Sequence, residues 1–191
     1  MFPGEEPIIE AGTFLIATPS LRDPNFHRTV ILICDHDEQG SFGLVVNRPT
    51  GIPIKKVFEQ LTPPTGEDRS LFFGGPVDQE RLFALRRGVP AEDAGDVIGD
   101  GMFLPKDLEG SLDRIGSGLD LLQEYRFFVG YSGWSAGQLE AELVEQSWIA
   151  VSGIEDLLFE TAPEQLWSAA LRGLGGEHTL WSMMPPDPDW N

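Results

Sequence analysis

Cysteine is almost missing from this chain of 191 residues, since Cys34 is the only one. A single thiol excludes an internal disulfide and every zinc or redox site built on paired cysteines. Long apolar runs are missing too, because nowhere do 18 apolar residues stand together, which argues against a membrane-spanning helix. The first residues also lack the basic and apolar parts of a signal peptide, so we expect a protein of the reducing cytoplasm with no membrane partner.

Basic residues are scarce, with 13 Lys and Arg against 31 Asp and Glu and a net charge of −18. A field of this sign repels DNA and RNA, so direct nucleic-acid binding is not expected. The imbalance is uneven: residues 1–115 carry 19 acids and 11 bases, whereas residues 116–191 carry 12 acids and 2 bases. We therefore expect any anion-binding patch in residues 1–115, and the candidates for it are Arg22, His27, Arg28 and Arg48.

The composition that remains is typical of a folded protein, with 41% hydrophobic and 23% charged residues. A chain of this length suits one hydrophobic core. We predict a single domain over residues 1–191, with loose ends at 1–11 and 185–191.

Hydrophobic patterns predict strands early in the chain and helices at irregular intervals. Residues 29–34 form an apolar run rich in branched side chains, which is typical of a strand buried on both faces. This order favours an α+β fold, a single domain with a large mixed, mainly antiparallel β-sheet and several peripheral helices. The other predicted strands are 13–18, 41–47, 71–73, 82–85 and 126–131, and residues 88–101 are a predicted loop. Helices are predicted at 54–61 and 137–146. Two more helices are predicted, one that starts at Pro105 and one that follows a capping-box pattern at Thr161 to Glu164.

Residues 133–137 read Gly-Trp-Ser-Ala-Gly, which matches the nucleophile elbow of serine hydrolases. The segment lies between a predicted strand and a predicted helix, as that motif requires. An acid and then His178 follow Ser135 in chain order, but only 56 residues follow Ser135, and no glycine-rich oxyanion segment precedes it. We therefore assign no catalytic residue, and Ser135 and His178 are the candidates if the chain is a serine hydrolase.

Metal and cofactor signals are missing. Cys34 and His36 are predicted on one side of a strand, but two ligands do not make a metal site, and a thiol inside an apolar run is typical of an inert core residue. The Gly-Gly-Pro turn at residues 74–76 lacks the lysine of a phosphate-binding loop. We expect no metal and no cofactor.

Three segments carry a recurring combination of glycine, proline, aromatic and polar residues: 12–49, 74–77 and 130–148. Phe159 and Trp167 continue the pattern toward the C-terminus. In this order the segments resemble the YqgE/AlgH family of small bacterial proteins. The resemblance implies an α+β fold with a large mixed sheet, a cytosolic location and, for some members, the label of transcriptional regulator, and it brings no catalytic residues.

The sequence predicts a non-catalytic binding or regulatory domain of this type, with a protein or a small ligand as its partner. The alternatives are a transcriptional regulator that acts through a protein partner and a serine hydrolase that acts through Ser135. Polar residues at recurring positions are hard to explain by core packing, so we predict a binding surface around them. Its candidate residues are Asn47, Arg48, Gly74, Gly75, Pro76, Tyr131, Trp134, Gln138 and Glu140.

Overall fold

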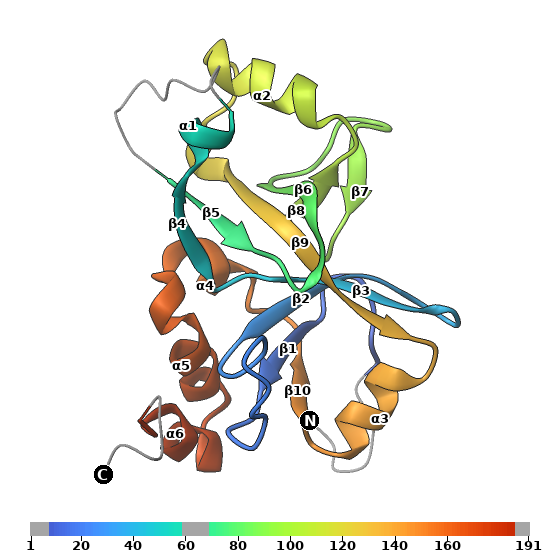
Figure 1. Cartoon of the computed structure of the whole chain (residues 1–191), viewed down its shortest axis with the longest axis vertical. Helices are drawn as coiled ribbons and strands as arrows, with labels where there is room; N and C mark the ends of the chain where they lie inside the picture. Colours follow the sequence, from blue (N-terminus) through green and yellow to red (C-terminus); the bar gives the residue numbers. More distant parts are fainter. Residues whose placement is uncertain (1–7, 59–68, 186–191) are drawn as a thin grey trace.

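Ten strands form one mixed sheet in the computed structural model, which describes residues 8–58 and 69–185 (Figure 1). The order along the main path is β10-β1-β2-β3-β9-β6-β8-β7, and β4 and β5 branch from this path at β9. The bounds of the strands are β1 (Phe14–Ala17), β2 (Val30–Asp37), β3 (Gly40–Val45), β4 (Pro49–Pro53), β5 (Ser70–Phe73), β6 (Val77–Arg87), β7 (Gly95–Val97), β8 (Met102–Pro105), β9 (Tyr125–Ser135) and β10 (Trp148–Val151).

Six α-helices of the described residues surround this sheet, so the predicted α+β fold is confirmed. Figure 1 places α1 and α2 at one end of the molecule and α3, α5 and α6 at the other. Within the described ranges, no helix has the length and apolarity that crossing a bilayer requires. The bounds of the helices are α1 (Ile54–Val57), α2 (Leu108–Gly116), α3 (Gln138–Val144), α4 (Glu155–Glu160), α5 (Pro163–Leu174) and α6 (Gly176–Ser182).

Strand β9 joins the two parts of the sheet. Its last residues pair antiparallel with β3, for example Ser132 with Gly43, whereas its first residues pair antiparallel with β6. On the edge opposite β6 it pairs in parallel with β5, through Phe72 and Phe128. Every residue of β9 therefore has neighbours from segments far away in the sequence.

The core explains why the run at residues 29–34 is apolar throughout. Leu32 and Cys34 pack into the cluster that α5 covers, and Ile31 and Ile33 pack into a second cluster with Leu139 of α3. Successive side chains of a strand point to opposite faces, so both faces of β2 must be apolar. The predicted burial of this strand on both faces is confirmed.

Two predicted helix starts are wrong. Pro105 ends β8, and α2 begins at Leu108, where the carboxylate of the N-cap residue Asp107 accepts a hydrogen bond from the Gly110 amide. Helix α5 begins at Pro163 without a side-chain cap, so the Thr161 capping box does not form. Proline fixes a φ that suits a helix start and a strand end equally, which is why its position alone misled the prediction.

The short strands were also missed. Strand β7 lies inside the predicted loop 88–101, and β4, β8 and β10 have only four or five residues each. Such segments offer too few positions for an alternating pattern, and their strand partners supply the hydrogen bonds that define them. The helix predicted at 54–61 is present as α1 over its first four residues, and residues 59–61 lie outside the described ranges.

Candidate functional site

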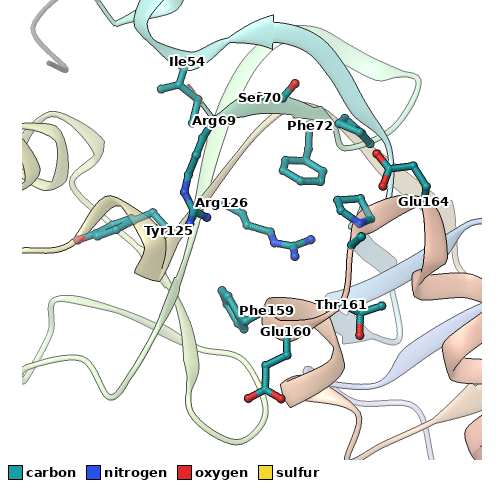
Figure 2. Close-up of a pocket in the computed structure, with 13 residues that line it drawn as sticks. Ile54, Arg69, Ser70, Phe72, Tyr125, Arg126, Phe159, Glu160, Thr161 and Glu164 are labelled. Atoms are coloured by element: carbon teal, nitrogen blue, oxygen red, sulfur yellow. The ribbon is translucent and has the colours of Figure 1, made fainter. Parts of the chain in front are cut away.

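A cavity of about 360 Å³ lies between the sheet and the connection from α4 to α5 (Figure 2). Strands β4, β5 and β9 form one wall, and residues 159–164 form the other. This volume lies in the range of small-molecule sites. The charged side chains of the lining are Arg69, Arg126, Glu160 and Glu164.

Arg126 is the most unusual residue of this lining, because its guanidinium is buried. The residue is only 7% exposed. Its Nη1 donates to the carbonyl of Val46 at 2.8 Å, and its Nη2 donates to the carbonyl of Leu158 in α4. The rings of Phe72 and Phe159 lie 4.9 and 5.7 Å from its Cζ atom. These contacts fix the guanidinium at the centre of the cavity in Figure 2.

The charge of Arg126 is not paired with a carboxylate of the described residues. Among the residues that the structure describes, no Asp or Glu lies within ion-pair distance of its guanidinium. Burial, and then the positive charge of Arg69, lower the pKa of Arg126 to about 10. The group is still a cation at neutral pH. A buried cation without a counter-charge is costly, so an anion in the cavity would stabilise it.

The rim of the cavity is acidic. The Glu160 carboxylate lies 3.9 Å from Arg87 Nη2, and Figure 2 shows it pointing away from Arg126. Glu164 lies in the first turn of α5, on the side of Phe72 in the same view. In the described part of the chain, Glu164 forms no ion pair. The site thus combines a cationic floor with an acidic rim.

The predicted surface residues Asn47 and Arg48 both bind backbone within the protein. The Asn47 side chain accepts from the Val30 amide at 2.9 Å and donates to the Arg28 carbonyl at 3.0 Å. The Arg48 guanidinium donates to the carbonyls of Pro24 and His27, at 2.8 Å each. Both side chains therefore hold the segment before β2 against the end of β3.

The arginines near this segment contact different parts of the fold. Arg28 lies over the Trp167 ring at 4.3 Å and donates to the Met184 carbonyl, so it attaches the C-terminal helices to the sheet. Arg22 is exposed. The predicted anion patch in this segment stays a prediction, and its cations have separate roles in the fold.

The turn after β5 is buried rather than exposed. A Cβ atom on Gly74 would lie 2.2 Å from the Gly130 carbonyl oxygen, and one on Gly75 would lie 2.2 Å from the Tyr131 carbonyl, so only glycine fits at both positions. Pro76 and Tyr131 are half-buried. Packing of the turn against β9 explains these glycines, and their predicted binding role stays untested.

Trp134 and Gln138 belong to a network around Glu142. Trp134 and Trp148 donate their indole N–H groups to Glu142 Oε2 at 2.9 and 2.7 Å, and the Gln138 amide donates to Oε1 at 2.9 Å. Glu142 thus accepts hydrogen bonds from the indoles of two buried tryptophans. Glu140 is exposed and lies 3.6 Å from His36 Nε2.

Ser135 is the last residue of β9, and its hydroxyl donates to Gln138 Oε1 at 3.2 Å. It is not among the residues with positive φ, so it lacks the strained backbone of a nucleophile elbow. His178 lies in α6 with its ring against Trp181. In residues 8–58 and 69–185, no hydrogen bond joins Ser135 to a histidine, so the hydrolase hypothesis gains no contact in its favour.

Cys34 and His36 show no metal geometry. The Cys34 thiol is buried against the Leu32 carbonyl, and burial raises its pKa well above the ordinary value. His36 Nδ1 lies 2.8 Å from the Ser41 hydroxyl. Within the described residues, no group of three or more His, Cys, Asp or Glu side chains lies close enough together to hold a metal ion.

Sequence reasoning missed the cavity because its lining comes from four separated segments. One signal was nevertheless present, since Arg126 is one of only two bases after residue 115 and stands inside the aromatic run Tyr-Arg-Phe-Phe. A cation at an interior position of a buried strand must have a special environment. Our expectation of an anion patch within residues 1–115 covers Arg69 but not Arg126.

Comparison with known proteins places this chain among small bacterial proteins of the same length. It is 39% identical over 185 residues to the UPF0301 protein CT0663 of Chlorobaculum tepidum, with 96% of this chain and 97% of that protein covered. A solved structure of DIP2367 from Corynebacterium diphtheriae, 22% identical, has the same fold, with a TM-score of 0.80 and 95% of each chain covered.

The AlgH protein of Pseudomonas aeruginosa is also similar, with 33% identity, a TM-score of 0.74 and coverage of 96% of this chain and 98% of that one. A family model described as AlgH-like matches residues 14–179. These relatives cover nearly the whole chain, which confirms the resemblance seen in the sequence. The chain belongs to the AlgH-like, or UPF0301, family.

Proposed function

We propose that this chain is a non-catalytic binding domain that holds a small organic anion in the cavity around Arg126. One observation carries the proposal: a guanidinium that is 7% exposed faces a cavity of about 360 Å³ with no carboxylate of the described residues beside it. Two backbone carbonyls hold its orientation. Such a fixed donor group suits recognition of a carboxylate or a phosphate.

Catalysis is not part of the proposal, because the cavity offers binding groups rather than a reaction centre. Its lining contains no histidine, cysteine or lysine, and within the described residues the hydroxyl groups of Ser70 and Thr161 form no hydrogen bond to a carboxylate. Tyr125 donates its hydroxyl to Asp120. Burial and this hydrogen bond raise its pKa to about 12, so it is a poor base or nucleophile at neutral pH.

A regulatory role of the kind predicted from the sequence would act through this ligand and a protein partner. The net charge of −18 opposes direct contact with DNA. Binding of an anion would neutralise Arg126 at the contact between β9 and α4, and so would change the stability of that contact.

Calorimetric titration of the purified chain with 3-phenylpropionate and with inorganic phosphate tests the proposal. We expect at least one of them to bind with a Kd of about 1 mM or lower. Arg126→Met should remove the binding, whereas Arg172→Met, the same change at an exposed position of α5, should leave it unchanged. Failure of both anions to bind, or equal binding by the Arg126→Met variant, would overturn the proposed function.

A further inference from the structure

The two walls of the cavity differ in charge. Arg69 and Arg126 lie on the sheet side, and Glu160 and Glu164 lie on the side of α4 and α5 (Figure 2). From this arrangement, and resting on the proposed anion site, we infer that the ligand is a zwitterion: an α-amino acid with an apolar side chain. Its carboxylate would bind Arg126 and its ammonium group would bind Glu164.

The acidic rim disfavours ligands that are only anionic. A phosphate monoester carries nearly two negative charges at neutral pH, and both would repel the rim carboxylates as well as the field of a chain with net charge −18. A carboxylate with a nearby ammonium group has no net charge. Its two charged groups, which are attached to one carbon atom, would lie between Arg126 on the sheet side and Glu164 on the side of α5.

Glu164 is the better partner for the ammonium group. Glu160 already lies near Arg87, which also binds Asp156 at 2.8 Å, and its carboxylate points away from Arg126 in Figure 2. Glu164 has no ion pair within residues 8–58 and 69–185, and so keeps its charge available for a ligand. A charge-assisted hydrogen bond to an ammonium group is among the stronger polar contacts.

Apolar residues on both walls of the cavity suit an apolar side chain. Pro49, Ile54 and Phe72 come from β4, α1 and β5, and Pro163 comes from α5. These residues present carbon atoms and few hydrogen-bonding groups. An aliphatic or aromatic substituent would lose water-exposed surface against them, which favours binding.

Three compounds that share a phenylethyl group separate the parts of this inference in a calorimetric titration: L-phenylalanine, 3-phenylpropionate, which lacks the amine, and 2-phenylethylamine, which lacks the carboxylate. We expect phenylalanine to bind the unmodified chain about 10-fold or more tightly than phenylpropionate, and phenylethylamine to bind least. Glu164→Gln should reduce the preference for phenylalanine to below about 3-fold. Glu177→Gln, the same change on the exposed surface of α6, should retain it.

The outcomes distinguish this inference from the proposed function. Phenylpropionate that binds as tightly as phenylalanine would overturn the zwitterion while the anion site stands. A preference for phenylalanine that survives Glu164→Gln would overturn the role of Glu164. If neither carboxylate binds, the zwitterion is wrong, and if inorganic phosphate fails to bind as well, the anion site is wrong too.

Discussion

Two arginine sites contact neighbouring residues of β9, Tyr125 and Arg126, and they differ in how the buried positive charge is paired. On the side of Tyr125, Arg86 and Arg114 donate to the Asp120 carboxylate at 2.9 Å, and the Tyr125 hydroxyl donates to it at 2.8 Å. The next residue, Arg126, donates to backbone carbonyls and faces a cavity. Arginines that are paired with a buried carboxylate can be explained by their contribution to stability. A buried arginine that faces a cavity without such a partner is instead a candidate for ligand binding.

The largest expected effect comes from removing Asp120, the carboxylate that pairs with Arg86 and Arg114. Asp120→Ala should lower the free energy of unfolding by about 3 kcal/mol, because it leaves Arg86 and the Tyr125 hydroxyl without their acceptor. Breaking a buried ion pair usually costs about 3–5 kcal/mol. The low end of this range applies here because the Arg114 side chain is 53% exposed and can turn to water. Urea denaturation measures the change.

The exposed residue Asp113 on α2 supplies the control for this variant. Asp113→Ala should change the free energy of unfolding by no more than about 0.5 kcal/mol. An Asp120→Ala variant as stable as this control would mean that the cluster does not stabilise the fold.

Acid should weaken the same site in a defined direction. Hydrogen bonds from Arg114 hold the pKa of Asp120 below its ordinary value of 3.8. Ionised Asp120 therefore contributes stability that is complete above that value and is lost as the pH falls through the lowered pKa. The difference in unfolding free energy between the wild type and Asp120→Asn should stay constant from about pH 7 to pH 5 and shrink below about pH 4.

Urea denaturation at each pH checks this dependence. The comparison with Asp120→Asn removes the contributions of the other carboxylates. A difference that already shrinks between pH 7 and pH 5 would contradict the lowered pKa.

The smallest effect on the free energy of unfolding is expected at Arg126. Lowering the pKa of Arg126 from 12.5 to about 10 corresponds to about 3 kcal/mol against the charged form, and methionine would remove this cost. The variant also loses hydrogen bonds to two carbonyls, each of which costs about 1–3 kcal/mol when left unmade. At about 1.5 kcal/mol for each carbonyl, these losses nearly offset the gain, so Arg126→Met should change the free energy of unfolding by no more than about 1 kcal/mol.

The same denaturation measurement compares this variant directly with Asp120→Ala. A loss as large as the one at Asp120 would mean that Arg126 is a structural residue, and the contrast between the two sites would disappear.

The sequence by itself determined those features that depend on local pattern. The apolar run at residues 29–34 predicted a strand buried on both faces, and the pattern at Thr161 to Glu164 predicted a helix after it, which is present as α5. The segments shared with the AlgH-like family were also readable, because they follow the chain in order.

Only the tertiary structure decided which polar residues face a cavity. Asn47 and Arg48 belong to the predicted binding surface, and their bonds to the backbone of residues 24–30 depend on strand packing that no local pattern encodes. Arg126 was placed in a strand correctly, yet its burial, and the lack of a carboxylate partner among the described residues, follow from the packing of β5 and α4 around it. Such contacts join residues 30 or more positions apart, so they exist only once the sheet has formed.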